Sequence, residues 1–222
     1  MYQFRFEVVF RNLGYLLDGL YWTFAITGLS LIGAMVFGLI AALLRLSGIP
    51  VISQLVRFYI DIFRGTPLLI QLVWIYYALP IAIGVSFSAF FSTVLTLWLN
   101  MGAFLGEIFR AGIQSIDRGQ RDAAFVLGMN YRQTMQHIVL PQAVTRMLPP
   151  IGSSMIVILK DSSLASVLAV PELTYQGTVL QASTFRPIEI LTVVAVIYFI
   201  LNYPLTLFVD WLERRTGLKD RH

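Results

Sequence analysis

The chain has 222 residues, of which 57% are hydrophobic and 13% are charged, and its net charge is +4. A soluble domain has about 25% charged residues, so these proportions exclude a water-soluble enzyme and a disordered chain. The absence of cysteine excludes disulfides and thiolate chemistry, and two histidines are too few for a three-histidine zinc site. No separate polar region stands out, so we expect one membrane domain over residues 1–222 and no metal site.

Stretches without charged residues mark the candidate membrane spans, because about 20 apolar residues cross the hydrocarbon core of a bilayer. The stretch between Arg64 and Glu107 is long enough for two spans, and Pro80 and Gly84 mark a turn within it. The amphipathic segment 50–63 can lie at the membrane interface or lead into the second span. The sequence thus predicts an all-α polytopic membrane protein with five transmembrane helices, at approximately residues 19–44, 65–82, 87–106, 142–160 and 190–209.

The basic residues are distributed unevenly between the two sides that these five spans define. When the C-terminus is placed inside, 12 Lys and Arg residues fall on the inner side and 3 on the outer side. Cytoplasmic segments of membrane proteins carry an excess of Lys and Arg. We therefore expect the N-terminus outside the cell and a cytoplasmic C-terminus, which carries Arg214, Arg215, Lys219 and Arg221.

The segment 107–141 is the most polar part of the chain and is predicted to be a cytoplasmic loop. Asp122, Ala123 and Ala124 are followed by Gly128 and then, after nine residues, by the run Ile138, Val139, Leu140, Pro141. Such a pattern predicts a short helix, a glycine break, a second helix and a proline-led return to the membrane. An ordinary helical hairpin without a partner would have the same pattern, so the residue types alone leave its function open.

This spacing resembles the E-A-A-x3-G-x9-I-x-L-P coupling motif of the permeases of binding-protein-dependent ABC importers. Three further blocks, Phe63 to Leu68, Arg110 to Ile116 and Lys160 to Leu164, are similar to the polar amino-acid branch of that family. The resemblance extends from about Leu17 to Arg215, nearly the whole chain. It departs from the motif at Asp122, which replaces glutamate and keeps the negative charge.

The resemblance implies a type I permease subunit of an ATP-driven amino-acid importer, which forms the translocation path in a bacterial inner membrane. No nucleotide-binding G-x-x-x-x-G-K-[ST] motif is present, so we expect neither a catalytic site nor a cofactor in this chain. ATP and Mg would bind to a separate dimer of ATP-binding subunits. The other implied partners are a second permease subunit, identical or homologous, an extracytoplasmic amino-acid-binding protein and the amino acid itself; no nucleic acid is expected. The implied coupling residues are Asp122, Ala123, Ala124, Gly128, Ile138, Leu140 and Pro141.

Ionisable residues at membrane depth are rare, because each costs at least about 2.5 to 3.5 kcal/mol to insert. Lys160 and Asp161 occupy such a position at the end of the fourth predicted span. In one interpretation they belong to a substrate path with Asn100, Ser153 and Ser154, where the Asp161 carboxylate faces a substrate ammonium. In the other, Lys160 and Asp161 pair with each other, or across a permease dimer, and hold the span in place. We expect Arg64 to mark the inner end of the second span rather than to bind substrate.

An ion-coupled secondary amino-acid transporter is the alternative function. Such a protein needs ionisable groups within its spans and usually contains two related halves. Only Asp61, Asp161 and Glu189 lie near membrane depth, and the sequence shows no internal repeat. The ATP-driven importer is therefore the preferred prediction.

Overall fold

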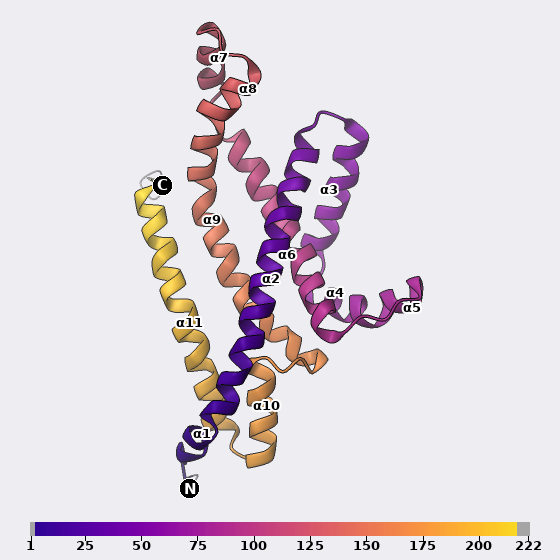
Figure 1. Cartoon of the computed structure of the whole chain (residues 1–222), viewed down its shortest axis with the longest axis vertical. Helices are drawn as coiled ribbons and strands as arrows, with labels where there is room; N and C mark the ends of the chain where they lie inside the picture. Colours follow the sequence, from indigo (N-terminus) through magenta and orange to yellow (C-terminus); the bar gives the residue numbers. More distant parts are fainter. Residues whose placement is uncertain (1–2, 217–222) are drawn as a thin grey trace.

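The computed structural model describes residues 3–216, which contain helices and no strand. Four long helices run side by side: α2 (Leu13–Leu46), α6 (Ala89–Gln114), α9 (Leu140–Asp161) and α11 (Pro187–Arg215). As Figure 1 shows, a hairpin made by α7 (Arg118–Val126) and α8 (Tyr131–Thr134) projects from one end of this bundle. The opposite end carries the N-terminus with α1 (Glu7–Arg11), and α10 (Leu173–Thr184). We call these the hairpin end and the N-terminal end.

Helices α2 and α6 form the centre of the bundle because small residues let their backbones approach closely. A Cβ atom added at Gly38 would lie 2.8 Å from the Leu105 Cβ and 3.0 Å from the backbone of Gly102 and Gly106. Membrane helices use such small residues at their contacts, since lipid provides no hydrophobic force to press helices together. The glycines at these positions therefore set the spacing of α2 and α6.

Replacing Gly38 by alanine is expected to destabilise the bundle by about 1 to 3 kcal/mol, because backbone atoms must shift to admit the methyl group. The matched control is Gly28→Ala on the same helix, where an added Cβ meets nothing within 4 Å. Thermal unfolding of the purified protein in detergent should show a lower midpoint for Gly38→Ala only. Equal midpoints for the two variants would contradict the close contact.

The chain turns sharply between α3 (Pro50–Gly65) and the segment that follows. The second limb consists of α4 (Leu68–Val73), a π-helical turn (Trp74–Ala78) and α5 (Leu79–Ile83), and it is bent by 109° from α3. Pro67 causes this break, because a proline ring disfavours helical geometry in the residue before it, here Thr66 with ψ 146°. Figure 1 shows α4 and α5 extending sideways from the bundle.

This bend separates most of the predicted second span, 65–82, from α3. The residues 68–83 are too few to count as a span alone, and the amphipathic segment 50–63 belongs to the first limb of the bent pair. Within residues 3–216, four helical segments are long and apolar enough to cross a membrane, or five when the bent pair is counted. The all-α, five-span fold class is thereby confirmed.

The coupling loop is shorter than the predicted 107–141. Helix α6 continues to Gln114, and the chain is helical again from Arg118. The charged residue used as a boundary, Glu107, is compatible with the helix because its carboxylate pairs with Arg45 at 2.8 Å and with Arg110 at 2.6 Å. Neutralisation by two arginines lowers the cost of placing a carboxylate on a largely buried helix. The other long helices also extend beyond their predicted spans, and Lys219 and Arg221 lie outside the described residues.

At the N-terminal end, hydrogen bonds at the first turn of α10 connect this helix to the bundle. The Glu172 carboxylate is buried and accepts hydrogen bonds from the backbone N–H groups of Thr174 and Tyr175, at 2.8 and 2.7 Å, and from the Tyr198 hydroxyl at 2.9 Å. Burial raises the pKa of Glu172 above its usual value, and these hydrogen bonds oppose the rise. Glu172 therefore joins α10 to α11 as well as capping α10.

Candidate functional site

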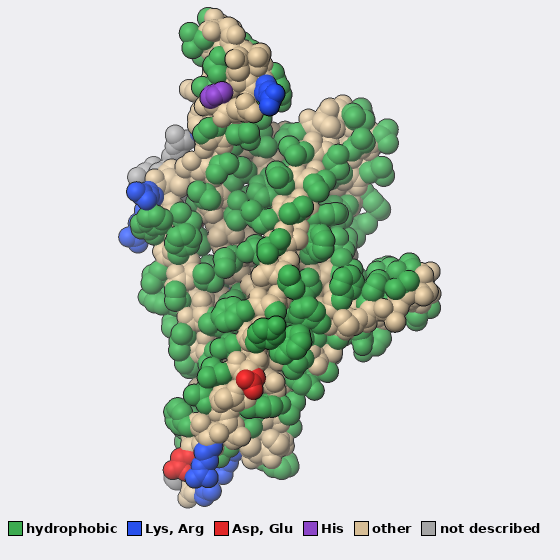
Figure 2. Space-filling view, viewed as in Figure 1, with side chains coloured by type: hydrophobic (Ala, Val, Ile, Leu, Met, Phe, Trp, Pro, Cys, Tyr) green, Lys and Arg blue, Asp and Glu red, His purple; other side chains and the backbone are tan. Residues whose placement is uncertain are grey.

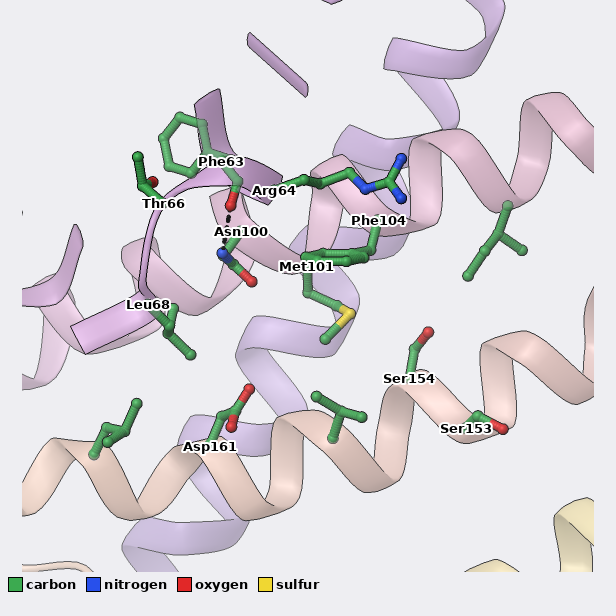
Figure 3. A pocket seen from close by; sticks show the side chains of 13 residues that line it. Phe63, Arg64, Thr66, Leu68, Asn100, Met101, Phe104, Ser153, Ser154 and Asp161 are labelled. Carbon is green, nitrogen blue, oxygen red and sulfur yellow. Dashed lines mark hydrogen bonds between the residues drawn. The ribbon is translucent and has the colours of Figure 1, made fainter. Parts of the chain in front are cut away.

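A cavity of about 400 Å³ opens where the corner between α3 and α4 faces α6 and α9. It is shown in Figure 3, in which the labelled side chains come from these three parts of the chain. Four of the five predicted path residues line it, namely Asn100, Ser153, Ser154 and Asp161. The tertiary structure thus brings together residues up to 61 positions apart in the sequence. The remaining lining residues are Phe63, Arg64, Thr66, Leu68, Met101, Phe104, Ile108, Val157 and Leu164.

Asn100 holds the corner of the cavity in place. Its Nδ2 donates to the backbone oxygen of Phe63 at 2.9 Å and to Oε1 of Gln71 at 3.0 Å. The Gln71 amide in turn donates to the Phe63 oxygen and to both the backbone and side-chain oxygens of Thr66. The two amides therefore satisfy acceptors that the helix break at Thr66 and Pro67 leaves without helical partners. Gln71 was not singled out from the sequence, since only the fold places it beside Asn100.

Asp161 points into the cavity from the end of α9, as Figure 3 shows. Ser154 precedes it by seven residues, which is about two helical turns, so both side chains lie on one face of the helix. The Ser154 hydroxyl also donates to the backbone oxygen of Pro150 at 2.9 Å. Polar groups at two levels of the cavity therefore come from a single helix.

Lys160 does not join the other predicted path residues. Its side chain is exposed and is not among the residues that line the cavity. Adjacent residues on a helix point about 100° apart, so Lys160 faces away when Asp161 faces the cavity. Among residues 3–216 there is no ion pair between Lys160 and Asp161 within 4.0 Å. The described chain therefore shows no direct contact between the two charges, and a pair across a dimer stays a prediction.

Arg64 also lines the cavity, a position that the sequence did not indicate. Its guanidinium carbon lies 5.1 Å from the centre of the Phe104 ring, a distance typical of a cation–π contact. Arg64 is the penultimate residue of α3 and lies directly before the sharp turn that follows Gly65. The cavity therefore contains one cationic and one anionic side chain among its described lining residues.

The predicted coupling residues lie at the hairpin end. Asp117 caps α7 by accepting a hydrogen bond from the Gly119 N–H at 2.6 Å, and α7 ends before Gly128. Gly128 has a φ of +77°, a left-handed conformation that glycine adopts readily and other residues rarely adopt. Asn130 and Gln133 then form a capping box at the start of α8. The predicted glycine break between two helices is thus observed.

The surface of the hairpin is more apolar than the motif suggests. Asp122 and Ala123 are exposed, whereas Ala124 is 3% exposed and packs within the hairpin. The sequence did not indicate the exposed apolar side chains of the hairpin tip, which Figure 2 shows at the top of the molecule. These residues, which we call the hairpin tip, are Phe125, Val126, Leu127 and Tyr131, and their exposed fractions are 50%, 88%, 80% and 70%.

The attachment of the hairpin to the bundle also differs from the expectation. The chain does not restart at Pro141, since α8, a π-helical turn (Met135–Val139) and α9 form one continuous helical segment. A π-helical turn accommodates the proline, which has no N–H to donate and crowds the preceding turn. This turn leaves Ile138 half-buried and Leu140 38% exposed, whereas Val139 is fully buried in the core. Val139 is therefore the residue of this turn that packs into the core of the bundle.

Comparison with known proteins shows the family. The family model described as "Binding-protein-dependent transport system inner membrane component" matches residues 34–218. The chain belongs to this family. The glutamine transport system permease protein GlnP of Escherichia coli (strain K12) is 37% identical over 214 residues, which cover 96% of this chain and 98% of that protein. The probable glutamine ABC transporter permease protein GlnP of Bacillus subtilis (strain 168) is 40% identical, with coverage of 92% and 95%.

Solved structures agree with this assignment. A crystal structure of an amino acid ABC transporter with histidines has a TM-score of 0.90 and 35% identity, and the match covers 96% of this chain and all of that one. An inward-facing structure of the MetNI methionine ABC transporter has a TM-score of 0.76 at 20% identity, which shows a shared fold alone. The predicted type I fold and the resemblance to amino-acid importer permeases are confirmed.

Membership of the family settles the functional class. The chain is a membrane-spanning permease subunit of an ABC importer, and such importers include an ATP-binding subunit and a binding protein. The alternative of an ion-coupled secondary transporter is wrong. The family is one of transport components rather than of enzymes.

Proposed function

We propose that this chain forms the translocation path for a polar amino acid and that the cavity between Arg64 and Asp161 is the substrate site. The observation that carries the proposal is the pair of opposite charges in one cavity of about 400 Å³. An amino acid at neutral pH is a zwitterion with complementary charges. The guanidinium of Arg64 suits the substrate carboxylate, and the carboxylate of Asp161 suits the substrate ammonium.

The lining favours a substrate with an uncharged side chain. Asp161 is the one acidic residue among the described residues of the cavity, so no second carboxylate is available for a cationic side chain. Ser153 and Ser154 contribute hydroxyl groups that can bind an amide or a hydroxyl. Two of the relatives are named for glutamine transport, which agrees with such a lining.

Reconstitution of the whole importer in proteoliposomes tests this proposal. With the binding protein present, glutamine should stimulate ATP hydrolysis and accumulate in the vesicle, whereas arginine and glutamate should do so less. The same binding protein without amino acid is the control. Absence of stimulation by every polar amino acid would contradict the proposed substrate class.

The hairpin is the proposed docking surface for the ATP-binding subunits, where ATP and Mg bind. Its exposed Asp122 offers a charge for a basic or amide group, and the hairpin tip offers apolar side chains that a groove on the partner can bury. Isolated monomers rarely expose so much contiguous apolar surface without a partner. In the complete complex, two permease subunits, identical or homologous, would each engage one ATP-binding subunit.

The proposed orientation places the hairpin end in the cytoplasm of a bacterium. Because the chain has no cysteine, single cysteines can report accessibility. Phe185 and Gln136 are both exposed. A membrane-impermeant maleimide should label Phe185→Cys in cells whose inner membrane is intact. It should label Gln136→Cys only after the inner membrane is permeabilised. Labelling of Gln136→Cys alone before permeabilisation would reverse the topology.

A further inference from the structure

Two arginines, one on α7 and one on α9, bind the C-terminal end of α6, the helix that carries Asn100. Arg121, on α7, donates from Nη2 to the backbone oxygen of Ile113 at 2.9 Å. Arg146, on α9, donates from Nη1 to the backbone oxygen of Ser115 at 2.6 Å and to its hydroxyl at 3.1 Å. Both arginines are half-buried. Neither was part of the coupling motif.

These contacts occupy the carbonyl groups that the end of a helix leaves without partners. The last turn of α6 is otherwise closed by Ser115, whose N–H bonds to Ala111 and whose hydroxyl bonds to Gly112. Arginine is well suited to the remaining carbonyls, because the C-terminal end of a helix carries partial negative charge. Charge-assisted hydrogen bonds are also stronger than neutral ones. The end of α6 is thus bound to the first helix of the hairpin and to α9, which follows the hairpin.

Apolar packing also joins α6 and α9 at this level. Ile113, Ile116 and Met147 belong to one buried cluster, and a Cβ atom added at Gly112 would overlap the Met147 side chain. The contact between Arg146 and Ser115 adds a polar connection to this packing, at a cavity of about 350 Å³ that both residues line. Without Arg121 and Arg146, the connection from the hairpin to α6 would depend on the short linker at 115–117 and on the apolar contacts alone.

We propose that Arg121 and Arg146 are positioning residues for transport, which make α6 follow the hairpin when the ATP-binding subunits move it. The inference rests on the proposed docking of those subunits at the hairpin. A displacement at the hairpin changes the cavity only when it moves the helices that line it, and α6 supplies Asn100, Met101 and Phe104. Coupling of this kind needs a physical connection between the two sites, and the arginine contacts provide one between the hairpin, α6 and α9.

The test compares Arg121→Gln/Arg146→Gln with Arg57→Gln/Arg214→Gln in the complete importer in proteoliposomes. Arg57 and Arg214 are exposed arginines outside the hairpin, so the control removes the same charge and leaves the proposed docking surface unchanged. We expect the first variant to assemble and to hydrolyse ATP, but to transport about tenfold less amino acid per ATP hydrolysed. The control should keep the wild-type ratio. Arg121→Lys/Arg146→Lys should recover part of it, because lysine retains the charge and a donor.

A distance measurement gives a readout that does not depend on transport. Spin labels at Ala111→Cys and Gln136→Cys, both exposed positions, report the placement of the hairpin relative to α6. The distribution should broaden in the double glutamine variant and stay narrow in the control. If the double glutamine variant assembles and transports the wild-type amount of amino acid per ATP, the inference is overturned. If that variant does not assemble, an unchanged distribution of spin-label distances overturns it. Failure of the wild-type complex to dock at the hairpin would instead refute the proposed function.

Discussion

Replacing Gly128 by valine is expected to reduce recovery of the ATP-binding subunit with the permease about tenfold. Gly128 has a φ of +77°, and an added Cβ would meet nothing within 4 Å, so the penalty comes from the backbone and not from a clash. Left-handed geometry costs an ordinary L-residue about 1 to 2 kcal/mol, and a β-branched residue is among the least tolerant. The turn also contains hydrogen bonds from Gly128 N–H to Phe125 and from Met129 N–H to Ala124, which a different turn would lose.

Gly128→Asn is the matched control, because asparagine adopts left-handed geometry more easily than other residues with a side chain. It should recover most of the assembly, which is measured by co-purification at a fixed detergent concentration. The permease itself should be produced in similar amounts in both variants, since the hairpin lies outside the bundle core. Normal assembly and normal uptake in Gly128→Val would show that the turn has no role in coupling.

Replacing Asp161 by asparagine is expected to leave the complex assembled while uptake falls at least about tenfold. The substitution keeps the shape and removes the charge that the proposed substrate ammonium needs, and each tenfold loss of affinity corresponds to about 1.4 kcal/mol. Asp161 has no ion pair with Lys160 in the described chain, so the substitution leaves no buried partner charge within this subunit. Basal ATP hydrolysis, complex yield and uptake are measured on one preparation.

The control is Asp61→Asn, which removes a carboxylate from α3 outside the cavity. Asp61 is 66% exposed and lies 3.5 Å from Arg57, an arrangement that contributes little to stability. Its uptake should equal that of the wild type. If the Asp161→Asn complex fails to assemble, the carboxylate belongs to a structural pair across the permease dimer. If it assembles and takes up amino acid like the wild type, Asp161 is not part of the substrate site.

Local features were predictable because their physical causes are local. The spacing of charges along the chain determined the number of spans, since each hydrophobic stretch must be long enough to cross a bilayer. The position of Gly128 determined where the chain reverses after α7, because a left-handed glycine acts within a few residues. The spacing of charges predicted an end of α6 that is too early, at Glu107. This carboxylate is neutralised by Arg45, which is 62 positions away in the sequence, so the pairing could not be predicted locally.

The sequence by itself therefore determined the fold class, the coupling turn and the polar residues of α9. Only the tertiary structure decided which of those residues meet. Arg64 of α3 lies over the Phe104 ring of α6, and helical rotation turns Lys160 away from the cavity that Asp161 enters. Distances between side chains on different helices depend on the packing of whole helices, which small residues such as Gly38 set at the contact of α2 and α6. No periodicity within one segment contains that information.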